Sequence, residues 1–316
     1  MKKRKGLMAI IIICLISFVA TIALGIACLS TMVREVGSGR LERAWYEFAQ
    51  RYDLYDAFSV VDDFDRDYDY NADGGYGEPS YYDQLPSVQR ADAENRIDLS
   101  AVPQGSDLEI SCDNAVLSVQ AGDTAAAQLT FTEDSTLTAD DYRFELFRAP
   151  DDLNRYLLVI DFSKPAVDAK LDVTLPESYV RQLEIDCDNA SMAISGIVCD
   201  ALDADADNGS ITAENITADQ SIELATDNGI IQLTNPSCNG SIDCEADNGE
   251  IAFSAGTLTG YTIDASTENG NIVNNLVSPA QSQANGSLRY ESPLADGSAN
   301  TRLYFQTDNG NITLNP

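Results

Sequence analysis

The residues with the clearest capacity for chemistry are carboxylates that recur at an interval of 19 to 21 residues, with the last member 40 residues on, each directly before an Asn. The members of this set are Asp188, Asp207, Asp227, Asp247, Glu268 and Asp308. Hard cations such as Ca²⁺ bind clusters of carboxylate oxygens, and millimolar extracellular Ca²⁺ fills even weak sites. The spacing therefore predicts weak Ca²⁺ binding between repeats, although the Gly-Gly-x-Gly-x-Asp nonapeptide of calcium-binding β-rolls is not found in the sequence.

The same positions also allow a structural interpretation, which we favour over metal binding. Asp and Asn suit turns because their short side chains hydrogen-bond nearby backbone groups. In this interpretation the carboxylate accepts a backbone N–H, and the Asn side chains bond one another from repeat to repeat. The predicted turn residues are Asn189, Asn208, Gly209, Asn228, Gly229, Asn248, Gly249, Asn269, Gly270, Asn309 and Gly310.

Signals for catalysis are sparse. The chain contains no histidine, which excludes His-activated nucleophiles and His-ligated metals. The remaining enzyme hypothesis is a β-helix glycosidase that uses paired carboxylates such as Asp205 and Asp207. Because acidic residues recur in every repeat and no single repeat stands out, we expect no enzyme activity, no catalytic residues and no cofactor other than Ca²⁺.

The elements that must position these residues are short strands on both sides of each turn. Six residues before each Asn, counting Asn114 as a first copy, the sequence always has Leu or Ile, and apolar or small residues follow at alternate positions. This period of two indicates a strand with one buried face. The aligned residues are Leu108, Leu183, Leu202, Ile222, Ile242, Ile263 and Leu303.

A fixed period of about 20 residues indicates a stack of equivalent units. We predict an all-β fold, a parallel β-solenoid with coils of about 20 residues and Asp-Asn-Gly turns. Asn-Gly between alternating runs is also the usual signal of an antiparallel hairpin, so a meander or sandwich is the alternative. The solenoid accounts better for equal residue sizes at equal offsets.

Acidic residues also occupy the position five before each Asn, which faces outward in this scheme. These residues are Glu109, Glu184, Asp203, Glu223, Asp243 and Asp264, with Tyr304 in the last copy. Stacked strands lie about 4.8 Å apart, so like charges at one offset repel.

No basic residue occurs between Gln182 and Leu288, and the formal net charge of the chain is −32. Such a field excludes nucleic acid as a partner and favours cations and basic partners.

The N-terminal residues predict a membrane anchor. Residues 1–6 hold four basic residues and form the expected cytoplasmic tail, and the uncharged residues 7–33 are long enough to span a bilayer. A cleaved signal peptide is the alternative. Residues 34–93 are an expected acidic, Tyr-rich spacer with a juxtamembrane helix at its start. We therefore expect a single-pass protein of the cell membrane whose C-terminal domain is extracellular.

The remaining chain divides into an N-terminal capping β region at 94–182 and solenoid repeats at 183–316. A cap is needed because the edge of a solenoid would otherwise be exposed. Since the last full copy stops at Pro316, we expect an open C-terminal coil that a partner or second subunit covers.

Five cysteines follow the anchor, namely Cys112, Cys187, Cys199, Cys238 and Cys244. Their odd number and irregular spacing do not match a disulfide framework or a metal site. Cys112 and Cys187 share one inward offset, so a disulfide between them is feasible if their coils are adjacent. Buried thiols are the favoured interpretation.

Residues 171–197, LDVTLPESYVRQLEIDCDNASMAISGI, followed by Asp-Asn-Gly-x-Ile units, resemble the bacterial putative-adhesin family. The resemblance covers residues 94–316 and implies a β-solenoid of unknown function at the cell surface, after one membrane span. We therefore expect a binding or adhesion scaffold with an unknown protein or glycan ligand. Since some relatives are associated with envelope-stress regulation, a sensory or regulatory component of such a system is the alternative.

Overall fold

The computed structural model describes residue 82 and residues 85–112, 114–132, 135, 137–150, 152–163, 169–189, 191–277, 280–292 and 301–316. They lie in one compact unit, Pro79–Pro316. The expected tail, anchor and juxtamembrane helix lie outside the described residues. Within the described ranges, no helix is long and apolar enough to cross a membrane. The secondary structure there consists of 21 strands and short 3-10 turns such as η4 (Leu99–Ala101).

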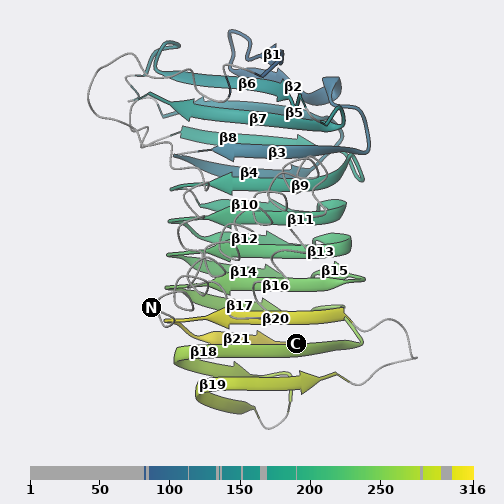
Figure 1. Ribbon diagram of the computed structural model, residues 1–316, viewed down its shortest axis with the longest axis vertical. Helices are drawn as coiled ribbons and strands as arrows, with labels where there is room; N and C mark the ends of the chain where they lie inside the picture. The colour runs from purple at the N-terminus through teal and green to yellow at the C-terminus, as the bar shows by residue number, and fades with distance from the viewer. Residues whose placement is uncertain are drawn as a thin grey trace, which may run out of the picture. The chain divides into compact units, whose positions relative to one another are not determined.

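Most strands belong to two parallel ladders that form two sides of a stack of coils (Figure 1). The first ladder holds the strands that precede the turns. In spatial order these are β7 (Arg155–Phe162), β3 (Ser106–Cys112), β9 (Val180–Cys187), β11 (Val198–Ala206), β13 (Thr217–Thr226), β16 (Ser241–Ala246), β20 (Thr301–Thr307) and the first half of β18 (Tyr261–Asn274), with the short β15 (Ser237–Cys238) also paired to β13.

The second ladder holds the strands that follow the turns. In the same order these are β8 (Ala169–Leu175), β4 (Ala115–Ala121), β10 (Met192–Ser195), β12 (Ile211–Glu214), β14 (Ile230–Thr234), β17 (Glu250–Ser254), β21 (Ile312–Asn315) and the second half of β18. Residues with equal offsets from the turn are paired, as in Leu202 with Ile222 and Ile222 with Ile242. The predicted register is therefore confirmed, and the fold is all-β and solenoid-like.

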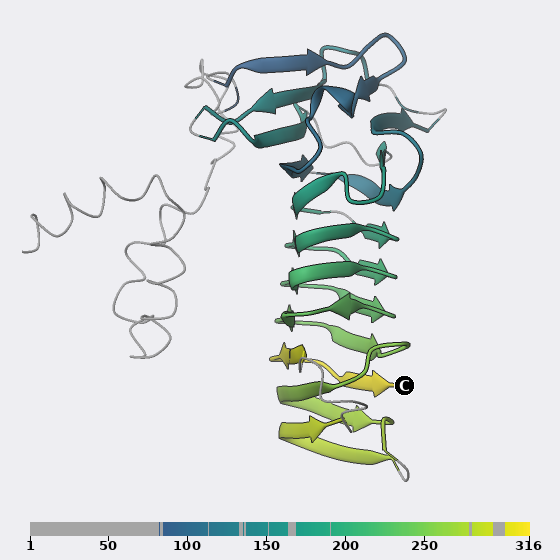
Figure 2. The ribbon, with the colours of Figure 1, turned by 90° about the vertical axis from the view of Figure 1, so that its right-hand side faces the viewer.

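The spatial order of the coils departs from the sequence order at two places. The β3–β4 coil lies between the β7–β8 and β9–β10 coils. The last coil of the chain, β20–β21, lies between β16–β17 and β18. Figure 2 shows the C-terminus inside the stack for this reason. The prediction that the coil ending at Pro316 forms the open end of the stack is therefore wrong, because β18 lies beyond that coil.

Antiparallel strands cover both ends of the stack. At one end β6 (Tyr142–Arg148) pairs with β7 and β5 (Ala126–Phe131) pairs with β8, and beyond them lie β1 (Ser87–Arg90) and β2 (Arg96–Asp98). Two coils of the stack thus fall within the expected cap, 94–182, and β1 falls within the expected spacer. At the other end β19 (Gln281–Glu291) pairs with both halves of β18.

The core runs through the whole stack as one continuous cluster of inward side chains. Most ladder strands, such as β11 and β13, alternate between buried and more exposed residues, because successive side chains of a strand point to opposite faces. Phe253 and Phe305 pack with ring centroids 5.1 Å apart, which joins the C-terminal coil to the β16–β17 coil. Inward residues thus hold the coils together and leave the outward face of each ladder for other roles.

Candidate functional site

The turns are held together by a ladder of Asn side chains. Within this ladder the Nδ2 atom of one Asn donates to the Oδ1 atom of the next. The distances are 3.2 Å (Asn208 to Asn189), 3.1 Å (Asn228 to Asn208), 3.2 Å (Asn248 to Asn228), 2.9 Å (Asn309 to Asn248) and 3.0 Å (Asn269 to Asn309). The backbone continues the pattern, since the Asn208 N–H donates to the Asp188 carbonyl oxygen at 2.8 Å. The structure thus aligns all the predicted turn asparagines in one column.

The turn glycines are explained by the close approach of neighbouring coils. A Cβ added to Gly229 would lie 1.6 Å from the carbonyl oxygen of Gly209, and Gly249 has the same relation to Gly229. The turn glycines are not among the residues with positive φ. Thr226, two residues before Asn228, donates its hydroxyl to the Gly209 carbonyl oxygen at 3.0 Å. Glycine is therefore required at these turns by the close stacking of the coils, and not by a left-handed backbone conformation.

The carboxylates before each Asn form a column beside the Asn ladder, which we call the turn column. It comprises Asp188, Asp207, Asp227, Asp247, Asp308 and Glu268 in spatial order. Partial desolvation, followed by the charge of Asp227, raises the pKa of Asp207. Desolvation and the charges of Asp227 and Asp308 likewise raise the pKa of Asp247. In the part of the chain that the structure describes, no group of three or more acidic or cysteine side chains is arranged to hold a metal ion.

A second column of carboxylates lies on the outward side of the first ladder, and we call it the strand column. It comprises Glu109, Glu184, Asp203, Glu223, Asp243 and Asp264, with Tyr304 between the last two. Directly opposed residues of parallel strands carry these charges about 4.8 Å apart. The two columns together form the acidic face of the stack.

Among the described residues, arginine neutralises the strand column only at its two ends, where Arg155 lies near the cap and Arg289 lies 3.8 Å from Asp264. Arg155 on β7 contacts both Glu109, at 2.6 Å, and Glu184, at 3.0 Å. Further along, desolvation followed by the charges of Glu223 and Glu184 raises the pKa of Asp203 to about 7. Desolvation and the charge of Glu223 raise the pKa of Asp243 to about 6. The middle coils therefore hold carboxylates whose charges repel one another.

Asp205 and Asp207, the candidate glycosidase pair, lie on the same acidic face. Desolvation, then the charges of Asp186 and Asp207, raise the pKa of Asp205 to about 6. Glu245, two coils further along, has a pKa raised by the same kind of cause, namely desolvation and the charges of Asp247 and Asp308. Burial and nearby carboxylates thus raise pKa values at several positions of the acidic face, and the pair is not distinguished from the others.

A second Asn position, which was not predicted from the sequence, lies at the next corner of the coil. Asn215 and Asn235 have φ of 55° and 51°, and the Asn235 Nδ2 atom donates to the Asn215 Oδ1 atom at 2.6 Å. Gly196, one coil earlier, has φ of 68°. The signal was present, because Gly or Asn follows the turn Asn by seven residues in these three copies.

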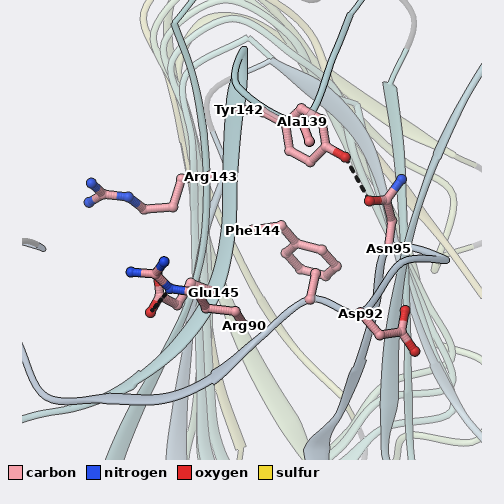
Figure 3. Close-up of a pocket in the computed structure, with 9 residues that line it drawn as sticks. Arg90, Asp92, Asn95, Ala139, Tyr142, Arg143, Phe144 and Glu145 are labelled. Carbon is pink, nitrogen blue, oxygen red and sulfur yellow. Dashed lines mark hydrogen bonds and ion pairs between the residues drawn. The ribbon is translucent and has the colours of Figure 1, made fainter.

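A separate cavity of about 340 Å³ opens in the cap (Figure 3). Its lining includes Tyr142, whose hydroxyl donates to the Asn95 Oδ1 atom at 2.6 Å, and Phe144. At its rim the Arg90 Nε atom contacts the buried Glu145 carboxylate at 3.1 Å. Arg90 and Glu145 neutralise each other at this rim, so the acidic face is the stronger candidate site.

Comparison with known proteins identifies the family. No curated protein matches the chain at a significant level. One similar solved structure is described as a putative cell adhesion protein from Clostridium sporogenes ATCC 15579, with 12% identity, a TM-score of 0.46 and coverage of 69% of this chain and 95% of that chain. Another is described as a putative adhesin from Bacteroides fragilis NCTC 9343, with 14% identity, a TM-score of 0.35 and coverage of 69% and 94%. The family model described as Toastrack DUF4097 matches residues 82–315. Because this match extends over most of the sequence, the chain belongs to the Toastrack DUF4097 family, and the resemblance to putative adhesins is confirmed.

Proposed function

We propose that the protein is a membrane-anchored extracellular scaffold that binds positively charged partners through the acidic face. The observation that carries this proposal is the strand column, in which Asp203, Glu223 and Asp243 lie directly opposite one another on adjacent strands. Desolvation, and after it this mutual repulsion, raises the pKa of Asp203 and of Asp243. A cationic partner that binds along the column relieves the repulsion, so the electrostatic strain of the free protein favours binding.

The partner that fits this face best is a basic protein segment or a glycan that carries amino groups. The acidic positions repeat along one side of the stack, so an extended ligand can contact several coils at once. Repetition also argues against catalysis, which needs one or two carboxylates set apart from the others. We therefore place the activity of this protein in binding and not in turnover.

Anchoring is the second part of the proposal. The apolar residues 7–33, with basic residues before them and a strongly acidic chain after them, would hold the folded unit outside the cell membrane. Attachment through the anchor leaves the acidic face available to partners in the extracellular space. The orientation is testable by labelling an introduced surface cysteine on intact cells with a membrane-impermeant reagent.

Binding is tested with the full chain in liposomes and lysozyme as the basic probe protein. The face variant Asp203→Asn/Glu223→Gln/Asp243→Asn removes three charges from the strand column. The matched control Asp123→Asn/Glu177→Gln/Glu214→Gln removes three exposed charges that lie elsewhere on the stack. We expect the face variant to lose most of the probe binding and the control to retain it. Equal binding by the two variants would refute the acidic face as the binding surface.

A sensory or regulatory role in envelope stress is the competing proposal. It predicts that deletion of the gene alters envelope-stress transcription while attachment is unchanged. The scaffold proposal predicts the opposite outcome, in which attachment to a basic surface falls and transcription is unaffected.

A further inference from the structure

Strand β19 forms the end of the stack opposite the cap and is paired on one side only. It pairs with β18 along both arms of that strand, and no other described strand pairs with it (Figures 1 and 2). Its 11 residues are exposed or half-buried throughout. An edge strand of this length presents a row of unpaired backbone groups and is a ready template for another strand.

The core is incompletely covered at this end. Leu288 and Tyr290 point toward the core from β19 but remain half-buried. On β18, to which β19 is paired, Asn274 occupies an inward position that is held by Leu233, Phe253 or Leu314 in other coils. The Nδ2 atom of Asn274 is buried and has no hydrogen-bond partner among the described residues. A further layer on β19 would bury the two apolar side chains.

The charge pattern identifies what that layer can be. Arg289 is the only charged residue of β19 before Glu291 at its end, whereas β18 beside it carries Asp264 in the strand column and Glu268 in the turn column. Arg289 lies 3.8 Å from Asp264 on β18 and 3.8 Å from Glu291. Two copies of this acidic chain therefore meet less repulsion when they approach through β19 than through the acidic face.

The shape of β19 suits contact with an identical strand. The strand turns a corner at Asn285, where φ is 43°, and its two arms follow the two arms of β18. A twofold axis through this corner exchanges the arms of two copies and places the strands antiparallel. Such an isologous contact uses the same surface on both subunits and closes as a dimer.

We propose that β19 is the interface for a second copy of this chain, which pairs antiparallel with it about the corner at Asn285. Inward side chains match inward side chains when Leu288 lies opposite Gln283 of the second copy and Tyr290 lies opposite Gln281. In this register Ser282 lies opposite Arg289, and no carboxylate faces another carboxylate. The two caps then lie at opposite ends of the dimer. The inference depends only on β19 and is independent of the binding function proposed for the acidic face.

The test is the dissociation constant of the dimer, measured for the full chain by sedimentation velocity in a density-matched detergent. Ser282→Lys places a cation opposite Arg289 and should weaken the dimer, whereas Ser282→Glu places an anion there and should strengthen it. Each contact occurs twice by symmetry, so the expected changes are roughly two- to thirty-fold. Ser282→Gln should leave the constant unchanged.

Matched controls separate this contact from general charge effects. Gln232→Lys and Gln232→Glu make the same charge changes at an exposed position of the interior strand β14. Because the chain is strongly acidic, added Lys at this site should leave the dimer unchanged or strengthen it slightly. A wild-type chain that stays monomeric would overturn the proposal and leave the edge to a strand of another protein. The proposal would also be overturned if the Lys and Glu substitutions changed the dissociation constant of the dimer equally at positions 282 and 232.

Discussion

The Nδ2 atom of Asn309 donates to the Oδ1 atom of Asn248 at 2.9 Å across 61 residues of sequence, and Asn269 in turn donates to Asn309 at 3.0 Å. The turn of the last copy is therefore inserted between two earlier ones. The C-terminal residues act as an interior layer of the stack. The end of the solenoid is formed instead by β18 and β19, which precede this layer in sequence.

Insertion of the last coil predicts slow hydrogen exchange at the C-terminus. Because β20 is paired on both sides, its amides should exchange about as slowly as those of β16, and β19 should exchange fastest in the stack. Hydrogen exchange of the full chain, read by mass spectrometry, measures this directly. Faster exchange in β20 than in β19 would mean that the C-terminus is the true edge.

The close approach of the turns predicts different outcomes at two glycines. In Gly229→Ala the added methyl group meets the Gly209 carbonyl oxygen at 1.6 Å, so the coils must separate. We expect a loss of more than about 2 kcal/mol in the free energy of unfolding, measured by denaturant titration. In the control Gly286→Ala the methyl group meets only the flexible Gln283 side chain, at 3.3 Å, and the loss should be below about 1 kcal/mol. Similar losses in the two variants would show that stacking distance does not constrain Gly229.

The register of the coils was predictable from sequence because the residue at each offset from the turn Asn faces either the core or the outside of the stack. Leu108, Leu183 and Leu202 recur six residues before an Asn, and they are indeed paired directly in the stack. A one-residue shift would expose every one of them, and a two-residue shift would separate the turn asparagines, so alternation and turn position together determine the alignment.

The order of the coils was not predictable in the same way. A coil that carries Leu or Ile at the inward offsets packs equally well on any other such coil, so local pattern does not specify its neighbour. The bridge from Arg155 to Glu109 and Glu184 depends on this order, because β7 is beside β3 only after the β3–β4 coil has been inserted. The uneven neutralisation of the strand column could not be inferred for that reason.

The insertion of the β3–β4 coil predicts one preferred disulfide. It places Cys112 directly opposite Cys187, both buried, and neighbouring strands lie within the range that a disulfide spans. Cys199 and Cys238 share a column but have Ala218 between them. Refolding in a glutathione redox buffer followed by peptide mapping should therefore recover the Cys112–Cys187 bond in preference to others. Recovery of Cys199–Cys238 as the main product would contradict the coil order.

Calcium is expected to act on the turn column as a screening ion only. The described residues provide no cluster of three ligands, and the carboxylates of the column are held on separate coils. At matched ionic strength, Ca²⁺ and Mg²⁺ should therefore shift the Tm of the full chain by the same small amount, measured against chelator. A rise of several degrees with Ca²⁺ alone would show specific binding and would assign Asp188, Asp207, Asp227, Asp247, Asp308 and Glu268 as candidate ligands.

Repulsion within the acidic face predicts that mild acid stabilises the protein. Asp203 holds its proton up to about pH 7 in the folded state, and Asp243 up to about pH 6, whereas both lose it near pH 4 when unfolded. The folded state thus binds more protons between these limits, so stability falls as pH rises through this window. Asp203→Asn should raise the Tm at pH 8 and flatten the pH dependence. The control Glu214→Gln, which lies off the acidic face, should leave the pH dependence as it is.

The most direct test of the central claim, that the carboxylates of the middle coils are uncompensated in the free protein, is the Tm of the wild-type full chain at pH 5 and at pH 8 in the same ionic strength. Our account predicts a higher Tm at pH 5. A Tm that is equal at both pH values, or higher at pH 8, would contradict it and would mean that the acidic face is neutralised within the molecule and has no need of a cationic partner.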